Sequence, residues 1–333
     1  MINKEEINNI LVTRTDNLGD MILTLPLISE TRKVFPEAGI FFMVKKYTSE
    51  ILKGYPGIDG LIIADDLGSI SEKIKCFKSK KIDLAMNVKP EFSLALAFLL
   101  SGVKYRIGTA YRWYSFLYNL KVHEHRKHST KHESEYNLNL LRTFFNELQN
   151  SRSFYFNYTE EEKNKLNGKL YGLIDRDFVI IHPGSRNSAK DLPLDIMSEF
   201  SAKLMNELPE MDVAITGTGN DKISNDFIYG KLKEKHPERV FNLTDMLDLR
   251  ELMILIDHSK LFVSNSTGPI HIAGALKKSI VGFYPNTVTM SNVRWGPLSD
   301  NAIILRPTTG ADDMSEISSD EILNAAVKLI KKN

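Results

Sequence analysis

The stretch RTDNLGDMILTLP, residues 14–26, places a carboxylate where a strand-like apolar run gives way to a helix. Asp20 follows the run at residues 10–14 and a turn through Asn17 and Gly19. A carboxylate at the carboxyl end of a strand can take a proton from a bound hydroxyl, so Asp20 has the chemistry of a general base. Asp and Asn also accept hydrogen bonds from the first turn of a helix. The residues alone leave both interpretations open.

A second stretch, HPGSRNSAKDLP at residues 182–193, follows the apolar run FVIIH and has the composition of a phosphate-binding loop. Gly184 lets a phosphate approach the backbone, and Ser185 offers a hydroxyl. Arg186 and Lys190 supply positive charge. The spacing differs from that of a Walker A loop. The alternative is a basic surface turn.

Two later loops also follow apolar runs. In TGTGND, residues 216–221, a Gly-x-Gly pair precedes Asp221, which could bind ribose hydroxyls or cap the next helix. In SNSTGPIHIAGAL, residues 264–276, hydroxyl and N–H groups precede a proline that favours the first turn of a helix. We expect four residues of this loop to face an anionic ligand: Ser266, Thr267, Gly268 and His271.

Basic and aromatic residues interleave between Lys104 and Lys131, where seven basic residues stand against a single acid, Glu124. Aromatic side chains favour the headgroup zone of a bilayer, and cations favour anionic lipid or phosphorylated sugar. This segment therefore predicts either of those contacts. The alternatives are a packed aromatic cluster under a solvated basic loop, or RNA binding, for which no RNA-binding module accompanies the segment.

Two patterns resemble metal ligands, and we predict no metal site from either. The histidines between His123 and His132 lie beside Glu124 and Glu133, in a segment with no regular element to fix their geometry. The Asp-x-Asp pattern at 175–177 precedes its strand, away from the edge where ligands gather.

The composition is that of an ordinary globular protein: 333 residues, 42% hydrophobic and 26% charged, with a net charge of +1. Near-neutral charge gives the whole chain no attraction to nucleic acid. A single cysteine, Cys76, excludes an internal disulfide and suits a reducing compartment. The polar N-terminus does not have the apolar core of a secretory signal, and the longest apolar run, residues 92–100, is too short to span a membrane. We expect a cytoplasmic protein, with peripheral membrane contact at most.

Short runs rich in Val, Ile and Phe alternate with helix-period segments, which is the β-α-β rhythm of a buried parallel sheet. Strands are predicted at 10–14, 39–44, 60–64, 82–88, 178–182, 211–216, 239–243, 260–264 and 279–284. Helices are predicted at 20–34, 69–78, 133–149, 193–207, 221–234, 248–257, 269–276 and 319–331. The polar stretch 157–177 reads as a linker. We therefore predict an α/β protein of two doubly wound domains, 1–160 and 161–333, with ligands in the cleft between them.

The ordered trio GDMILTLP, HPGSRNSAKDLP and SNSTGPIHIAGAL resembles glycosyltransferase family 9, the bacterial ADP-heptose:lipopolysaccharide heptosyltransferases and their relatives. The resemblance runs from about residue 10 to about residue 297. It implies a GT-B fold of two Rossmann-like domains, with the acceptor bound by the first and the nucleotide sugar by the second. It also implies inverting transfer that needs no metal ion or other cofactor.

The resemblance gives roles to single residues. Asp20 matches the general base, and Lys190 matches the lysine of a Lys-x-x-Pro stretch that contacts the donor. The remaining donor-binding residues it implies are Ser185, Arg186, Asp221, Ser266, Thr267, Gly268 and His271. We expect the acceptor to meet Arg14, Asn17, Lys104, Arg106 and Arg112. Heptosyltransferases commonly carry Asp where this chain has Ser266, so the donor need not be ADP-heptose.

The resulting hypothesis is a glycosyltransferase that moves a sugar, heptose from ADP-heptose by the resemblance, onto a lipopolysaccharide core or a lipid A-linked acceptor. A nucleotide-sugar epimerase on the same scaffold is one alternative. A non-catalytic two-domain ligand-binding protein is another. The C-terminal helix at 319–331 is amphipathic, and we expect it to pack back on the first domain, as GT-B tails often do.

Overall fold

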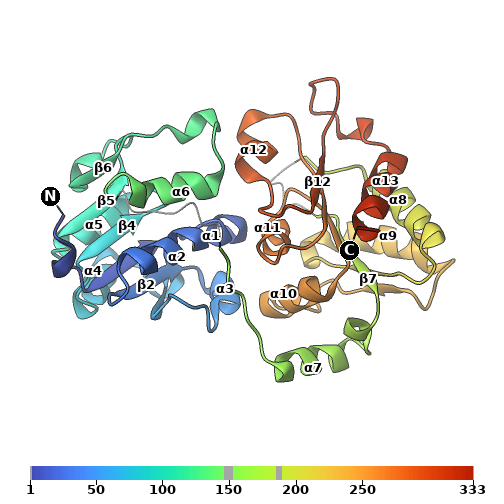
Figure 1. Cartoon of the computed structure of the whole chain (residues 1–333), viewed down its shortest axis with the longest axis horizontal. Coiled ribbons are helices and arrows are strands. Elements are labelled where there is room, and N and C mark those ends of the chain that lie inside the picture. The colour runs from blue at the N-terminus through green and yellow to red at the C-terminus, as the bar shows by residue number, and fades with distance from the viewer. Residues whose placement is uncertain (1, 146–152, 185–189, 333) are drawn as a thin grey trace. The chain divides into compact units, whose positions relative to one another are not determined.

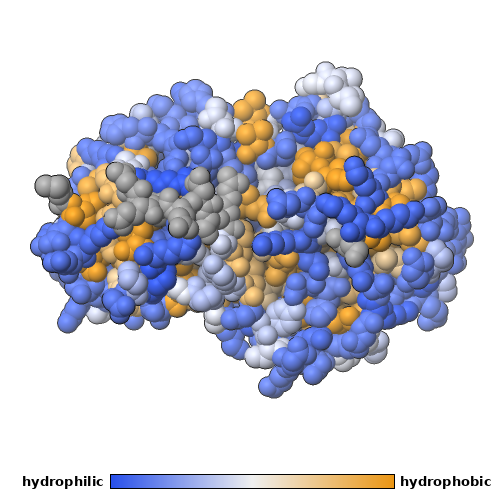
Figure 2. Space-filling view, in the orientation of Figure 1, coloured by the Kyte–Doolittle hydropathy of each residue, from blue (hydrophilic) through white to orange (hydrophobic). Residues whose placement is uncertain are grey.

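Two compact units make up the chain, Met1–Asn157 and Tyr158–Asn333, and each is built on a parallel sheet. The structure is a computed structural model, and it describes residues 2–145, 153–184 and 190–332. Figure 1 labels the elements along the chain. The surface in Figure 2 is largely hydrophilic, with hydrophobic patches in between. No helix in the described ranges is both long enough and apolar enough to cross a bilayer.

The described residues of the first unit form a six-stranded sheet in the order β3-β2-β1-β4-β5-β6. Its strands are β1 (Asn9–Thr13), β2 (Gly39–Val44), β3 (Gly60–Ile63), β4 (Leu84–Asn87), β5 (Tyr105–Thr109) and β6 (Leu120–Val122). Its helices are α1 (Leu18–Ile22), α2 (Leu25–Val34), α3 (Lys46–Ser49), α4 (Ile70–Ser79), α5 (Phe92–Leu100) and α6 (Glu133–Arg142). Short 3-10 helices are η1 (Lys4–Glu6), η2 (Glu50–Leu52), η3 (Ala64–Asp66), η4 (Ser115–Leu117) and η5 (Arg126–His128).

The described residues of the second unit repeat this plan in a six-stranded sheet ordered β12-β11-β10-β7-β8-β9. The strands are β7 (Phe178–His182), β8 (Asp212–Ile215), β9 (Val240–Asn242), β10 (Leu261–Asn265), β11 (Ile280–Phe283) and β12 (Ala302–Leu305). The helices are α7 (Glu160–Lys169), α8 (Leu194–Glu207), α9 (Lys222–Lys233), α10 (Leu249–His258), α11 (Gly268–Ala275), α12 (Asn292–Trp295) and α13 (Ser319–Ile330). Its 3-10 helices are η6 (Leu173–Asp175), η7 (Gly219–Asp221), η8 (Val288–Met290) and η9 (Met314–Glu316).

The central strands are apolar on both faces because helices cover both sides of a doubly wound sheet. In the first unit, Leu11 and Ala85 of the sheet lie in one core cluster with Phe77 of α4 and Phe98 of α5. In the second unit, residues of β7, β8, β10 and β11 share a core with α8 and α13. The predicted α/β class, with two Rossmann-like parallel sheets, is confirmed.

In each sheet the strand order reverses once, between β1 and β4 in the first unit and between β7 and β10 in the second. Helices leave the sheet on opposite faces at such a point, so a crevice opens outside the carboxyl ends of the two strands. The strand pairings within the described residues of both sheets are all parallel. The loops that follow β1 and β4, and those that follow β7 and β10, are therefore the ones placed for ligand binding.

Several local expectations need correction. Three strands that the sequence analysis did not predict, β5, β6 and β12, complete the sheets. The stretch read as a linker contains α7, which Thr159 and Glu162 begin with a reciprocal capping box. The predicted helix 20–34 is two helices, α1 and α2, and the described part of the predicted helix 133–149 is helical only to Arg142.

The C-terminal helix α13 belongs to the second unit. Its apolar face lies in the core of that unit, where Ile322, Ala326 and Leu329 are buried with residues of α8. Lys203 of α8 adds polar contacts to Ser319 and Asp320 at the start of the helix. The helix stabilises the second unit itself.

Candidate active site

Asp20 lies in the first turn of α1, just after β1 at the switch point of the first sheet. The N-cap residue Asn17 makes no side-chain cap bond in the structure, and Asp20 is the acidic residue of the first turn. The Asp20 carboxylate accepts a hydrogen bond from Nη2 of Arg14. Its side chain is 14% exposed, so it sits near the surface without being freely solvated.

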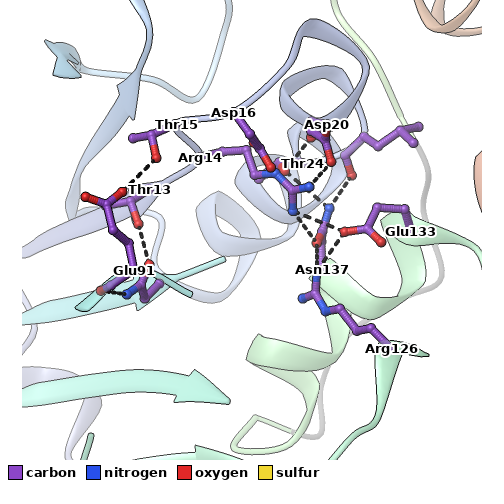
Figure 3. Close-up of polar contacts among 12 residues, drawn as sticks. Thr13, Arg14, Thr15, Asp16, Asp20, Thr24, Glu91, Arg126, Glu133 and Asn137 are labelled. Atoms are coloured by element: carbon purple, nitrogen blue, oxygen red, sulfur yellow. Dashed lines mark hydrogen bonds and ion pairs between the residues drawn. The ribbon is translucent and has the colours of Figure 1, made fainter. Parts of the chain in front are cut away.

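Arg14 is the centre of a buried polar cluster that Figure 3 shows in close-up. Its guanidinium is 4% exposed and contacts three carboxylates. Nε lies 2.7 Å from Asp16 Oδ1, and Nη1 lies 3.1 Å from Glu133 Oε1, while Nη2 contacts Asp20. Nη1 also lies 3.4 Å from Oδ1 of Asn137. One positive charge is thus divided among several acceptors.

Helix α6 supplies the far side of this cluster. Nδ2 of Asn137 donates to the carbonyl of Leu23 at 3.0 Å and to Oγ1 of Thr24 at 3.2 Å. Oγ1 of Thr24 in turn donates to the Asp20 carbonyl at 2.8 Å. Asn137 therefore fixes the end of α1 while Arg14 fixes the side chain that α1 carries.

Burial raises the pKa of Asp20 to about 6. Arg14 favours the charged carboxylate, but the carboxylates of Asp16 and Glu133 oppose it and burial dominates. Burial also disfavours the charged form of Arg14, yet the three carboxylates together leave its pKa above the usual value. A carboxyl group with such a pKa is ionised at neutral pH and is a stronger base than an exposed Asp.

The predicted acceptor residues do not all gather here. Lys104 precedes β5, at the sheet edge opposite Asp20, and pairs with Glu6 before β1. Arg106, near the same end of β5, donates to the carbonyls of Val103 at 2.6 Å and Leu117 at 2.9 Å. These two positions are wrong for an acceptor that meets Asp20, because parallel strands present their two ends at opposite edges.

The other three predicted acceptor residues lie at the carboxyl edge. Asn17 is exposed at the start of α1, and Arg112 is exposed three residues beyond the end of β5. Arg14 is at this edge too, but it is buried and bonded to carboxylates. The contacts of Arg14 hold the Asp20 side chain in place. A direct contact between Arg14 and the acceptor stays a prediction.

An exposed aromatic cluster lies at the same edge. Trp113 is 73% exposed and Phe116 is 69% exposed, both in the segment between β5 and β6. The ring of Phe92, at the start of α5, lies 4.9 Å from the ring of Trp113 at a tilt of 30°. Tyr111 stacks on His125 with ring centroids 3.6 Å apart. The alternative of a fully packed aromatic cluster does not hold for Trp113 and Phe116, although Tyr114 and Tyr118 beside them are buried.

In the second unit, Asn265 connects the two loops at the switch point. This side chain at the end of β10 is fully buried. Its Nδ2 donates to the carbonyl of Pro183 at 2.6 Å, and its Oδ1 accepts from the backbone N–H of Leu192 at 2.9 Å. One amide therefore holds both ends of the segment predicted to bind phosphate. Ser185 and Arg186 of that segment lie outside the described residues.

Lys190, at the described end of the same segment, has a side chain that is 58% exposed. Its Nζ lies 3.8 Å from the carboxylate of Asp312 and 3.5 Å from the Asp312 carbonyl. Asp312 follows β12 and accepts hydrogen bonds from the N–H groups of Asn286 and Thr287, which follow β11. Lys190 is thus a solvent-accessible cation at the carboxyl edge of the second sheet.

Asp221 is 7% exposed and forms the capping box of η7. Its Oδ2 accepts from the N–H of Thr218 at 2.8 Å and from the Thr218 hydroxyl at 3.0 Å. Glycine is required at two neighbouring positions, because a Cβ at Gly184 would lie 1.9 Å from Asp221 Oδ1 and a Cβ at Gly217 would lie 2.9 Å from Asp221 Cβ. The capping alternative is therefore present, and ribose binding by Asp221 stays a prediction.

The start of α11 has the form expected for an anion-binding turn. Thr267 occupies the N-cap position without a side-chain cap bond to the helix, and Pro269 stands in the first turn. The Thr267 hydroxyl lies 3.1 Å from that of Ser264. Gly268 is half-buried, and His271 is 5% exposed on the same helix. The Ser266 side chain hydrogen-bonds to the buried phenol of Tyr284.

Among the residues that the structure describes, no three His, Cys, Asp or Glu side chains gather as a group that could hold a metal ion. Two residues of the Asp-x-Asp pattern precede β7 and form ion pairs: Asp177 pairs with Lys260, and Arg176 pairs with Asp212.

Three residues around the predicted site were missed by the sequence analysis as site residues: Glu133, Asn137 and Asn265. Glu133 and Asn137 are separated from Arg14 by 119 and 123 positions, and no local pattern links them to it. Asn265 stands inside the motif SNSTGPIHIAGAL, directly before the hydroxyl residues, so its position in that motif was an available signal.

Comparison with known proteins agrees with this geometry. The family model for glycosyltransferase family 9 (heptosyltransferase) matches residues 72–321. Lipopolysaccharide heptosyltransferase 3 of Escherichia coli K12 is 26% identical over 300 residues, covering 86% of this chain and 84% of that protein. Lipopolysaccharide heptosyltransferase 2 of the same organism is 24% identical over 314 residues, covering 90% and 88%.

Solved structures have the same fold. The chain superposes on E. coli ADP-heptose lipopolysaccharide heptosyltransferase II with a TM-score of 0.85 at 22% identity, covering 97% of this chain and 99% of that one. A family 9 glycosyltransferase from Veillonella parvula gives a TM-score of 0.83 at 19% identity, with 98% of each chain covered. The predicted GT-B type of fold is thereby confirmed. The chain belongs to glycosyltransferase family 9, and it is a glycosyltransferase.

Proposed function

We propose that this glycosyltransferase transfers a heptose from ADP-heptose, with inversion and without a metal ion, to the core of a lipopolysaccharide acceptor. The observation that carries the proposal is Asp20, a partly buried carboxylate with a raised pKa at the switch point of the first sheet. The E. coli relatives are named as lipopolysaccharide heptosyltransferases, which supports the sugar and the acceptor.

In the proposed reaction the acceptor oxygen attacks the anomeric carbon of the donor sugar while Asp20 takes the hydroxyl proton. The new C–O bond forms on the face opposite the one from which the diphosphate oxygen departs, so the configuration inverts. The leaving ADP carries the negative charge that this bond cleavage releases.

The second unit supplies groups to stabilise that charge. Lys190 is an accessible cation, and the first turn of α11 presents N–H groups beside Thr267 and Gly268. His271, Ser185 and Arg186 complete the proposed donor set. We assign neutralisation of the diphosphate to these side chains and backbone groups instead of a metal ion.

The experiment that tests the function uses purified protein, ADP-heptose and a lipopolysaccharide acceptor truncated before the transferred sugar, with EDTA throughout. We expect heptose transfer with an inverted anomeric configuration, identified by NMR of the product. Asp20→Asn should lower turnover by roughly 10² to 10⁴ and retain donor binding. Full turnover in Asp20→Asn would remove Asp20 from the mechanism.

A thermal-shift panel of ADP-, GDP- and UDP-sugars tests the donor, which Ser266 leaves as the least constrained part of the proposal. A ligand at about 100 times its dissociation constant adds ~2.7 kcal/mol of stability. We expect the ADP-sugar to give the shift. If only a GDP-sugar or a UDP-sugar stabilised the protein, it would still be a glycosyltransferase, but its donor would not be ADP-heptose.

We also propose a cytoplasmic enzyme in shallow peripheral contact with the inner membrane through the exposed aromatic cluster. Trp113 and Phe116 supply apolar surface, and Arg112 is an exposed cation between β5 and β6. Vesicles containing anionic lipid should co-sediment with the protein. The double variant Trp113→Ser and Phe116→Ser should stay in the supernatant, and equal co-sedimentation would refute the contact.

A further inference from the structure

Glu133 is a carboxylate at the start of α6 that is 1% exposed and lies between two guanidinium groups. Its Oε1 is 3.1 Å from Nη1 of Arg14 and 2.7 Å from Nη1 of Arg126. A buried carboxylate is costly unless charged partners surround it, so this position calls for an explanation beyond local helix formation.

The two arginines have different surroundings. Arg14 is 4% exposed and also contacts Asp16, Asp20 and the amide oxygen of Asn137. Arg126, in η5 after β6, is 25% exposed, and its guanidinium also contacts Asn137. Figure 3 shows Glu133 and Asn137 on one side of Arg14 with Asp16 and Asp20 on the other.

We propose that Glu133 is a positioning residue for Asp20, which acts through Arg14 by fixing its guanidinium and by drawing part of its positive charge away from Asp20. The inference rests on the proposed role of Asp20 as general base. It adds a residue that touches neither donor nor acceptor and sets how strong that base is.

Three charged groups act directly on the Asp20 carboxyl group: Arg14, Asp16 and Glu133. Arg14 favours the ionised carboxylate, while Asp16 on the preceding turn and Glu133 on α6 disfavour it. Arg126 partly neutralises Glu133 from η5. A base paired to an arginine without competition would be a weak base, because the guanidinium stabilises the charged form. Competition from Asp16 and Glu133 leaves Asp20 oriented by Arg14 and still able to accept a proton near neutral pH.

The test is the pH dependence of kcat/KM in three glutamine variants. Glu133→Gln retains a side-chain oxygen that can accept a hydrogen bond, but it removes the negative charge. We therefore expect the acidic limb of the kcat/KM profile to move to lower pH by roughly one unit. We expect kcat above pH 7.5 to fall by up to about tenfold, because a weaker base removes the proton less readily, while donor KM stays unchanged. Arg126→Gln removes a positive charge that partly neutralises Glu133. The acidic limb of this variant's profile should therefore move to higher pH.

Glu30→Gln is the matched control. Glu30 is also 1% exposed and ion-paired in the first unit, but its partner is Lys33 of the same helix α2, at 2.7 Å. We expect its pH profile to coincide with the wild type. Glu133→Asp restores the charge, and its acidic limb should return toward the wild-type position.

The outcomes separate this inference from the function on which it rests. If Asp20→Asn keeps full turnover, the proposed base fails. If Asp20→Asn is inactive while Glu133→Gln and Arg126→Gln leave the acidic limb in place, the base stands and the role of Glu133 is refuted. A merely structural role would lower activity in both variants without moving the limb in opposite directions. Because Arg126 is partly exposed, its variant gives this readout even if Glu133→Gln does not fold.

Discussion

Replacing Gly184 with alanine should destabilise the second unit, because there is no space for the added methyl group. The new Cβ would lie 1.9 Å from Oδ1 and 2.5 Å from Cγ of Asp221. Asp221 is 7% exposed and bonded twice to Thr218, so it cannot move aside without giving up the cap of η7.

Two contributions set the size of the effect. Overpacking costs about 1–3 kcal/mol, and loss of a capping interaction costs about 1 kcal/mol. We therefore expect Gly184→Ala to lose roughly 2–4 kcal/mol of unfolding free energy. For a unit of this size that loss lowers the melting temperature by very roughly 4–16 °C.

The assay is calorimetric melting, together with hydrogen exchange of peptides from residues 212–233, where the effect should be concentrated. Titration with ADP should show at least tenfold weaker binding, because the displaced loop begins the proposed donor site.

Gly168→Ala is the control for this prediction. Gly168 lies near the end of α7, with open space around the position of a Cβ. Alanine there should raise stability by up to about 1 kcal/mol through helix propensity. A Gly184→Ala protein that melts like the wild type, with unchanged exchange at 212–233, would refute the packing argument.

Three further predictions concern Asp20 and Asn265. The kcat/KM of the wild type should rise with pH through an apparent pKa of about 6, because Asp20 must be ionised to act as a base; a flat profile between pH 4.5 and 8 would contradict this. The native pKa of Asp20 lies above its unfolded value of 3.8, so the native state binds the extra proton and the contribution of Asp20 to stability falls as pH rises from about 4 to about 6. The unfolding free energy of Asp20→Asn should therefore rise relative to that of the wild type over that interval, which urea unfolding at pH 4 and pH 7 can measure. An equal difference between the two proteins at both pH values would count against a raised pKa of Asp20. Asn265→Ala removes two buried hydrogen bonds, to Pro183 and from Leu192, and should cost about 2–4 kcal/mol. Its affinity for ADP, measured calorimetrically well below the melting temperature, should drop about tenfold, and unchanged affinity would show that the ends of this segment need no fixing.

In each unit a buried asparagine side chain holds the segment that carries the proposed site residues. In the first unit, Asn137 fixes the backbone of α1 and Arg14 fixes its carboxylate. In the second unit, Asn265 fixes the two ends of the segment that runs from Pro183 to Leu192. Buried amides can donate and accept at once, and they carry no charge that burial would penalise. This suits them to hold loops that must present charged groups to a ligand.

The sequence by itself determined the class of the fold and the location of the site motifs. Strand β2 coincides with its predicted range 39–44 and β7 with 178–182, because an apolar run buried on both faces is a local signal. The motif around Asp20 falls after β1, as the strand–turn–helix pattern predicts. Strands β6 and β12 escaped prediction because three or four residues in mixed surroundings carry too little periodicity to stand out.

Tertiary structure alone decided which side chains meet. Glu133 reaches Arg14 across 119 positions because α6 packs against α2, and no spacing rule within the chain encodes that contact. Lys104 and Arg106, chosen from a basic run, lie at the wrong end of β5, since strand direction sets the edge to which each residue belongs. Composition can place a charge in a segment, but only the packing of the sheet and its helices decides which charges share a low-dielectric environment. The basicity of Asp20 depends on that environment.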